Sequence, residues 1–178
     1  MTDHSRDADI DLIRSRIRAV PDFPQPGVLF RDITPMLADA RAFEAAVDAM
    51  TAHFPHVDKV VAIESRGFLL GAPVALALHA GLVLVRKVGR LPGETVREDY
   101  ALEYGSNTLE IHKDAITQGD RVLIVDDVLA TGGTIRAAAN LVTRLGGTVE
   151  GVSLLIELAF LEGRSRLADL NVETVLVY

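Results

Sequence analysis

Short, unbroken runs of apolar residues recur along the chain, and most are separated by segments long enough for a helix. The runs cover residues 59–63, 82–85, 122–125, 148–156 and 172–177. Short runs rich in β-branched residues are typical of strands buried on both faces of a parallel sheet. Helices are predicted before or between them, at 39–54, 67–80 and 135–145. This alternation predicts an α/β fold with a mainly parallel twisted sheet flanked by helices.

The two ends of the chain show weaker patterns. Asp9 could cap a helix whose apolar residues reach Val20 at helical spacing, and the first residues are expected to fray. Residues 21–27 contain three prolines, which remove hydrogen-bond donors and fix φ, so a stiff loop is predicted there. A short helix at 160–169 and a strand at the sheet edge, 172–177, complete the predicted fold.

Residues 91–105, LPGETVREDYALEYG, form a charged segment bounded by glycines. Their interior offers little to bury, so we predict a flexible lid that would keep water from a reaction beneath it. The alternating sequence TLEIH follows closely, so a β-hairpin is the alternative.

Composition and charge argue against several classes of function. At 178 residues the chain has the size of one domain and can bury roughly 70% of its unfolded surface. A net charge of −7 argues against a nucleic-acid partner, since phosphate backbones are bound by basic surfaces. No apolar run has the roughly 18 residues of a membrane helix, and no cysteine is available for a disulfide or a thiolate metal site. With a polar start and no export signal, a cytoplasmic location is expected.

The stretch RVLIVDDVLATGGT, residues 121–134, contains the clearest chemistry. A buried strand is predicted to end in Asp126 and Asp127, and a small-residue loop then leads into a helix. Ligands of open α/β sheets bind beyond the carboxyl ends of strands. The loop and the helix N-terminus suit a phosphate, whereas the two carboxylates would repel one but could accept hydrogen bonds from a sugar diol. A ligand with a phosphate beside a ribose diol satisfies both parts.

Cations follow two other predicted strands. Arg66 comes shortly after one strand, and Arg86, Lys87 and Arg90 follow another. A positive cluster in an acidic protein, again at strand ends, predicts a site for pyrophosphate or phosphate. A solvated basic face is the alternative.

VLIVDDVLATGGT resembles the phosphoribosyl-pyrophosphate (PRPP) signature of the type I phosphoribosyltransferases. PDFPQPGVLFRDITPML, ESRGF, VRKVGRLPG, YALEYG and IEL are similar, in the same order, to segments of the adenine phosphoribosyltransferases within that family. The resemblance extends from about residue 10 to the C-terminus. It implies the type I phosphoribosyltransferase fold as a single domain over residues 1–178, whose N-terminal segment, about residues 1–37, contributes to a small hood over the base.

The resemblance also implies catalytic roles for individual residues. Asp126 and Asp127 would hold the ribose diol and stabilise positive charge that develops on the ribose. Glu103 would act near the reacting base. Tyr104 would belong to the lid and would reach either its own site or that of a neighbouring subunit.

Three binding sites follow from the same resemblance. The 5′-phosphate would be bound by Ala130, Thr131, Gly132, Gly133 and Thr134. Pyrophosphate would be bound by Ser65, Arg66, Arg86, Lys87 and Arg90. Adenine would be bound by Leu29, Phe30, Arg31 and Leu158. Phe30 and Leu158 would cover the two faces of the base. The family often has Lys where this chain has Arg90, which keeps the charge and changes the geometry. Its members often have a cis peptide where this chain has Glu64 and Ser65.

The implied reaction joins adenine to PRPP and gives AMP and pyrophosphate, through a transition state with oxocarbenium character. Mg²⁺ would be bound mainly through PRPP and water, because it prefers substrate oxygens and few carboxylates, and no protein ligand is assigned. The expected partners are the two small-molecule substrates and a second copy of the chain in a homodimer, with no nucleic acid and no membrane.

Two other functions remain open from the sequence. The first is transfer to another base, such as xanthine, guanine or orotate, because the PRPP loop does not contact the base. The second is a non-catalytic regulator that binds PRPP, although no basic extension for nucleic acid is visible. A P-loop nucleotide hydrolase is excluded, because the chain has no G-x-x-x-x-G-K-[ST] motif.

Overall fold

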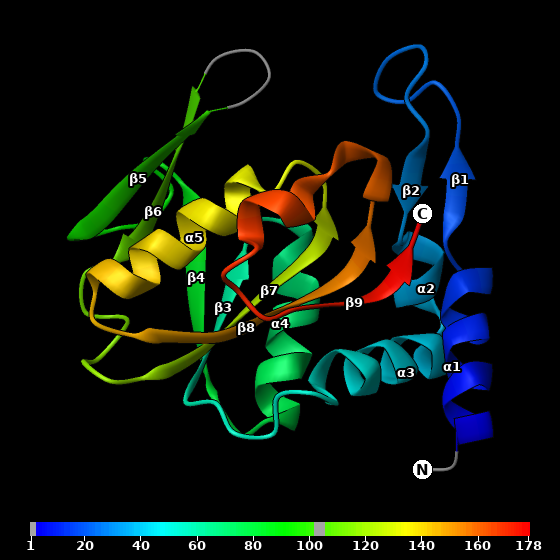
Figure 1. Ribbon diagram of the computed structural model, residues 1–178, viewed down its shortest axis with the longest axis horizontal. Helices are drawn as coiled ribbons and strands as arrows, with labels where there is room; N and C mark the ends of the chain where they lie inside the picture. The colour runs from blue at the N-terminus through cyan, green and yellow to red at the C-terminus, as the bar shows by residue number, and fades with distance from the viewer. Residues whose placement is uncertain (1–2, 102–105) are drawn as a thin grey trace. The chain divides into compact units, whose positions relative to one another are not determined.

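The structure is a computed structural model that describes residues 3–101 and 106–178, with side chains for residues 6–100 and 107–178 (Figure 1). The chain divides into two compact units, Met1–Ala49 and Met50–Tyr178. Most of the first unit consists of α1 (Asp3–Ser15), β1 (Arg18–Val20), β2 (Phe30–Asp32), α2 (Thr34–Ala38) and the greater part of α3 (Ala40–Thr51). The prediction of a helix reaching Val20 is wrong, because Val20 pairs with Phe30 in an antiparallel ribbon.

The loop between β1 and β2 is closed by its own hydrogen bonds. The carboxylate of Asp22 accepts the N–H of Gly27 at 2.8 Å, and the N–H of Phe23 donates to the carbonyl of Val28 at 3.2 Å. Gly27 has a φ of 85°, which a residue with a Cβ rarely adopts. These bonds and the fixed φ angles of the prolines agree with the predicted stiff loop.

The second unit is built on a seven-stranded sheet with the order β5-β6-β4-β3-β7-β8-β9. The strands are β3 (Lys59–Ile63), β4 (Gly81–Lys87), β5 (Thr95–Ala101), β6 (Ser106–His112), β7 (Arg121–Leu129), β8 (Thr148–Glu157) and β9 (Val172–Val177). The neighbouring strands β4, β3, β7, β8 and β9 run parallel to one another. The prediction of a mainly parallel sheet with the last strand at its edge is therefore confirmed.

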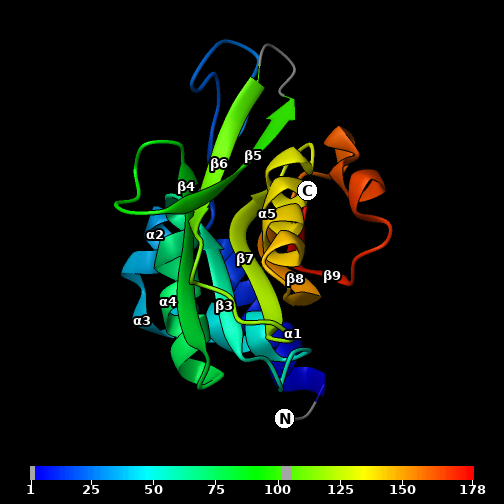
Figure 2. The ribbon, with the colours of Figure 1, turned by 90° about the vertical axis from the view of Figure 1, so that its left-hand side faces the viewer.

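Two helices cover opposite faces of this sheet. Figure 2 shows β3 and β7 between α4 (Arg66–Ala77) and α5 (Gly133–Arg144). Fully buried apolar side chains from the strands, such as Ile124 and Val152, pack with Leu141 of α5 in the main core. The short helix predicted at 160–169 is instead two 3₁₀ turns, η1 (Ala159–Leu161) and η2 (Gly163–Leu167). Glu162 separates them because its φ of 52° is left-handed.

The structure shows the β-hairpin that the sequence allows in this region, and the lid role of residues 91–105 stays a prediction. β5 and β6 pair antiparallel from Thr95 opposite His112 to Ala101 opposite Ser106. β6 also pairs with β4, which attaches the hairpin to the edge of the parallel sheet. Glu103 and Tyr104 lie outside the described residues. Among the helices of the described chain, none is long and apolar enough to cross a bilayer.

β7 is longer than predicted, so the acidic pair, Asp126 and Asp127, lies within the strand and not after it. The sequence predicts a strand that ends at Val125 with the two aspartates after it. In the structure β3 pairs with β7 only as far as Val125, whereas β8 pairs with it as far as Leu129. Asp126 and Asp127 therefore lie inside a strand, beyond the point at which pairing with β3 ends.

Candidate active site

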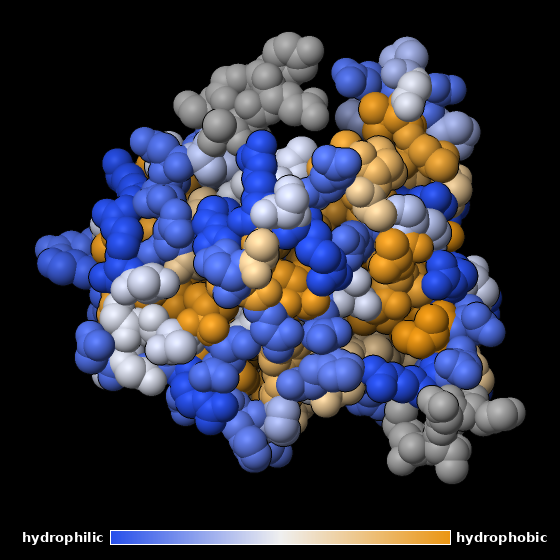
Figure 3. Space-filling model, in the orientation of Figure 1, coloured by the Kyte–Doolittle hydropathy of each residue, from blue (hydrophilic) through white to orange (hydrophobic). Residues whose placement is uncertain are grey.

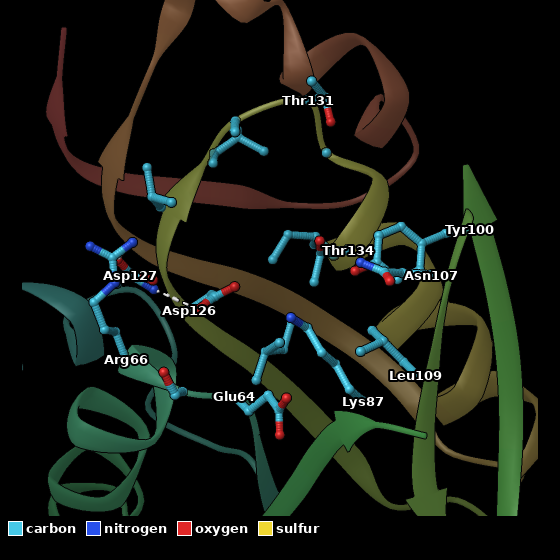
Figure 4. Close-up of a pocket in the computed structure, with 17 residues that line it drawn as sticks. Glu64, Arg66, Lys87, Tyr100, Asn107, Leu109, Asp126, Asp127, Thr131 and Thr134 are labelled. Carbon is cyan, nitrogen blue, oxygen red and sulfur yellow. Dashed lines mark hydrogen bonds and ion pairs between the residues drawn. The ribbon is translucent and has the colours of Figure 1, made fainter. Parts of the chain in front are cut away.

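A pocket of about 340 Å³ opens at the carboxyl ends of β3, β4 and β7 (Figure 4). Open α/β sheets bind ligands at this edge, and the volume suits a small molecule. The predicted site residues that line the pocket are Ser65, Arg66, Lys87, Asp126, Asp127, Ala130, Thr131, Gly132 and Thr134. Of the predicted residues that the structure describes in this unit, Arg86, Arg90, Gly133 and Leu158 do not line it.

The acidic pair lies almost completely buried in the pocket wall. Asp126 is 8% exposed and Asp127 is 5% exposed, and the carboxylate of Asp126 accepts the backbone N–H of Asp127 at 2.9 Å. Burial raises the pKa of Asp126 well above its usual value, and the charge of Asp127 raises it further. Burial also raises the pKa of Asp127, while the guanidinium of Arg66 opposes the rise. A ligand that brings hydroxyl donors or a cation would relieve this excess of negative charge.

Gly67 makes room for the first carboxylate. A Cβ at this position would lie 2.7 Å from Oδ1 of Asp126 and 3.2 Å from the carbonyl oxygen of Val125. Only a residue without a side chain lets the first turn of α4 approach β7 this closely. The glycine of the ESRGF segment therefore has a packing role that its sequence context did not reveal.

Of the four predicted cations, two line the pocket and two lie outside its lining. Arg66 forms an ion pair with Asp127 at 2.9 Å, and Lys87 points from the end of β4 into the pocket (Figure 4). Within the described part of the chain, the ammonium of Lys87 has no carboxylate in ion-pair range, which leaves its charge for an anionic ligand. Arg86 donates to Glu64 at 2.8 Å, and Arg90 is exposed.

The small-residue loop forms the opposite wall of the pocket. It turns at Gly132, whose φ of 79° is left-handed, and α5 starts at the next residue. The N–H of Arg136 donates to the carbonyl of Gly132 at 3.0 Å, and the Arg136 guanidinium binds the carbonyl of Arg166 at 2.9 Å. The loop thus lies at a helix N-terminus and is fastened to η2, an arrangement that suits an anion.

The hairpin contributes residues that the sequence did not single out. Tyr100 of β5 and Asn107 of β6 are opposite each other in the antiparallel register, and both line the pocket with Leu109 (Figure 4). Asn107 and Leu109 are two residues apart, so the alternation of a strand places them on one face. A sequence interpretation that started from the hairpin could have found them by this spacing.

The residues predicted to bind adenine lie in both units. In the first unit the rings of Phe23 and Phe30 make an edge-to-face contact with centroids 5.1 Å apart, and Leu29 is 49% exposed. Figure 3 shows apolar side chains on the loop between β1 and β2. In the second unit the N–H of Leu158 donates to the carbonyl of Leu129, a pocket residue, at 2.9 Å.

Comparison with known proteins decides the family. A phosphoribosyl transferase domain matches residues 34–170. An adenine phosphoribosyltransferase from Myxococcus xanthus is 57% identical over 180 residues, which cover 100% of this chain and 96% of the relative. The chain belongs to the adenine phosphoribosyltransferase family. The predictions of family and fold, which rest on the PRPP signature and the adenine-type segments along the chain, are confirmed.

Solved structures of this family have the same fold. The adenine phosphoribosyltransferase of Rhodothermus marinus has a TM-score of 0.93 at 51% identity, covering 97% of this chain and 99% of that one. The Saccharomyces cerevisiae enzyme has a TM-score of 0.91 at 41% identity, covering 96% and 99%. That structure was solved with adenine and 2,5-dideoxy-2,5-imino-altritol 1,6-bisphosphate. The chain is therefore a transferase of the phosphoribosyl class.

Proposed function

We propose that this chain transfers the phosphoribosyl group of PRPP to adenine and releases AMP and pyrophosphate. A single observation supports this more than any other: one pocket contains the buried pair Asp126 and Asp127, a loop suited to a phosphate, and the Lys87 cation. A ribose diol, a 5′-phosphate and a pyrophosphate would each have a matching wall. The names of the relatives supply adenine as the acceptor.

In the proposed reaction the N9–C1′ bond forms while the C1′–O bond to pyrophosphate breaks. The bonding electron pair leaves with pyrophosphate, and the N9 proton of adenine passes to a base near the acceptor nitrogen. Asp126 and Asp127 would accept hydrogen bonds from the two ribose hydroxyls and would place negative charge beside the carbon that becomes cationic. Glu103 remains the proposed carboxylate near N9, and Tyr104 remains a proposed lid residue.

Each anionic end of PRPP has its own proposed site. The 5′-phosphate would accept hydrogen bonds from the backbone and hydroxyls of residues 130–134. Ser65, Arg66, Lys87 and, from outside the pocket lining, Arg86 and Arg90 would bind pyrophosphate. Arg66 already pairs with Asp127, so it can bridge the two sites and hold the leaving group near the ribose.

The residues present fit a divalent cation that is bound mainly by the substrate. Among the described residues, no cluster of three His, Cys, Asp or Glu side chains could hold a metal ion, although the acidic pair leaves excess negative charge in the pocket. Mg²⁺ usually keeps several waters and binds through few carboxylates and substrate phosphates. We propose that Asp126 and Asp127 would hold the ion indirectly, through the ribose diol, and that a bound Mg²⁺ would supply positive charge to the pyrophosphate.

We propose that both units contribute to adenine binding: Phe30 and the backbones of Leu29 and Arg31 in the first unit, and Leu158 in the second. The ring of Phe30 is fixed by its contact with Phe23, and the loop beside it is closed by hydrogen bonds. A binding surface ordered before the ligand arrives loses little conformational entropy on binding. The contribution of residues 1–37 to a hood and the flexible lid at about residues 91–105 stay predictions, as does a cytoplasmic location.

The reaction is tested by measuring pyrophosphate release from PRPP and Mg²⁺ with adenine, hypoxanthine, guanine, xanthine, orotate and uracil. We expect release with adenine only, accompanied by AMP, because the base site is built from the adenine-type segments. Release with another base would keep the mechanism and overturn the base assignment. PRPP binding in calorimetry without release for any base would instead identify a regulator.

A homodimer is proposed from an apolar stripe on α4. Leu69 and Leu76 are 51% and 77% exposed and lie two turns apart on one helix face. Leu82 of β4 is 43% exposed, and its Cδ1 lies 3.7 Å from where a Cβ of Gly71 would be, so it adjoins the helix. Contiguous exposed apolar side chains of this kind mark interaction surfaces.

Replacing Leu76 with Glu should convert the dimer to a monomer, because a charge would be buried in an apolar interface. Light scattering after size-exclusion chromatography measures the mass. Val177, which is 52% exposed on β9, provides a matched control, and its replacement with Glu should leave the dimer intact. A monomeric wild type, or a Leu76→Glu variant that remains dimeric, would refute this assignment.

A further inference from the structure

Glu110 on β6 is a buried carboxylate that the proposed mechanism does not use. It is 1% exposed, and its Oε1 accepts the backbone N–H groups of Arg90 and Leu91, both at 2.9 Å. Its Oε2 accepts the hydroxyl of Thr95 at 3.2 Å and lies 3.6 Å from Nε of Arg97. Burial would raise the pKa of Glu110, but the hydrogen bonds outweigh it and hold that pKa below its usual value. The group is therefore a buried anion that is stabilised mainly by backbone donors.

The backbone held by Glu110 belongs to the loop at residues 88–94, which connects β4 to β5. Arg86 and Glu110 are opposite each other in the β4–β6 register. Arg86 donates through Nη1 to the carbonyl of Arg90 at 3.0 Å and through Nε to Glu64 at 2.8 Å. Glu64 lines the pocket. A continuous series of hydrogen bonds thus joins Glu110, the loop and the pocket wall.

We propose that Glu110 is a positioning residue for the pyrophosphate side of the site. It fixes the loop at 88–94, and the loop in turn fixes Arg86 and the end of β4, from which Lys87 enters the pocket. Glu110 does not line the pocket in the described structure, so it acts through these neighbours. This role rests on the proposed function, because it assumes that the cations after β4 bind the leaving group.

The test compares pyrophosphate with AMP, since only pyrophosphate uses the cations after β4. Calorimetry on the full chain with Mg²⁺ measures the affinity for each, beginning with the wild type. Glu110→Gln keeps the size of the side chain and removes the charge that holds two backbone N–H groups and a hydroxyl. We expect roughly tenfold weaker pyrophosphate binding, a similar rise in the KM for PRPP, and unchanged AMP binding.

Ser153→Ala provides the structural control. Ser153 is 2% exposed, and its hydroxyl donates to the carbonyl of Met50 at 2.7 Å. It lies on β8, which three strands separate from β6 in the sheet. Its loss should lower the unfolding midpoint and leave both affinities as they are. If Glu110→Gln does the same, or weakens AMP binding as much as pyrophosphate binding, Glu110 has only a structural role and the proposal is overturned.

A double-mutant cycle with Arg86→Ala tests the connection itself. If Glu110 acts through Arg86 and the loop, Glu110→Gln should weaken pyrophosphate binding far less in the Arg86→Ala background than in the wild type. If Glu110→Gln weakens pyrophosphate binding by the same factor in both backgrounds, the two effects are additive and the proposed connection is overturned. A wild type that neither forms AMP nor binds pyrophosphate would refute the proposed function before any variant is considered, so the two failures are distinguishable.

Discussion

Replacing Asp126 with Asn should lower kcat by roughly two to three orders of magnitude while making the ligand-free protein more stable at mildly alkaline pH. The loss of activity follows from the charge that Asp126 would place beside the ribose cation. The gain in stability follows from burial, because the wild-type protein holds two adjacent carboxylates that are 8% and 5% exposed. Asn keeps the shape of the side chain and can still accept the N–H of Asp127.

The sign of the pH dependence can be derived from the raised pKa. Between the usual aspartate value of 3.8 and the raised value in the folded protein, the folded state binds a proton at Asp126 more tightly than the unfolded state does. The stabilisation from this proton is fully present below 3.8 and is lost as the pH rises through the raised pKa. The variant has no such group, so its stability advantage over the wild type should grow with pH across this window.

Unfolding midpoints of both proteins over a pH series, together with steady-state kinetics, test this prediction. Asp120→Asn is a matched control, since Asp120 directly precedes β7 and its carboxylate accepts the N–H of Thr117 at 2.8 Å. That variant should keep full activity and should show no stability gain that grows with pH. An Asp126→Asn protein that is less stable than the wild type at every pH would show that the carboxylate is not under electrostatic strain.

The sequence predicts the order of the parallel strands and of the helices between them, and the edge of the sheet that is expected to bind ligands, because both follow from local patterns. β3 has the predicted bounds, and β9 is the predicted edge strand. The acidic pair and the loop at 130–134 were found because a strand end, two carboxylates and small residues are adjacent in the chain. The extent of β7 was missed, because it depends on where β3 and β8 stop pairing and not on β7 itself.

Contacts between distant segments account for the rest. Tyr100 and Asn107 enter the pocket only because the hairpin folds back beside β4. Glu110 looks like any charged residue of a strand in the sequence, and only the fold brings the N–H groups of Arg90 and Leu91 to it. Spacing within β6 places Asn107 and Leu109 on one face, but it does not show what that face contacts, because the contact depends on how β6 pairs with β4.

Gly163 provides a further example of a contact between distant segments. It lies at the start of η2, and a Cβ there would overlap the carbonyl oxygen of Ala130 and lie 3.0 Å from the amide nitrogen of Gly132. In turn, a Cβ on Gly132 would lie 2.5 Å from the carbonyl oxygen of Gly163. Backbone therefore packs directly on backbone at the loop proposed to bind the 5′-phosphate, and neither side has a flexible side chain that could move away.

Replacing Gly163 with Ala should therefore displace the loop and raise the KM for PRPP by about one to two orders of magnitude, because a shift of roughly 1 Å can cost a hundredfold in a positioned site. AMP affinity should fall by a similar factor, since AMP also presents a 5′-phosphate, whereas pyrophosphate affinity should not change.

The control is Gly151→Ala on β8, where a Cβ would overlap the ring of Phe54. That overpacking should lower stability by about 1–3 kcal/mol without changing the KM for PRPP. If Gly163→Ala lowers stability as Gly151→Ala does and leaves the KM for PRPP and the AMP affinity unchanged, the packing of Gly163 serves the fold and not the phosphate site.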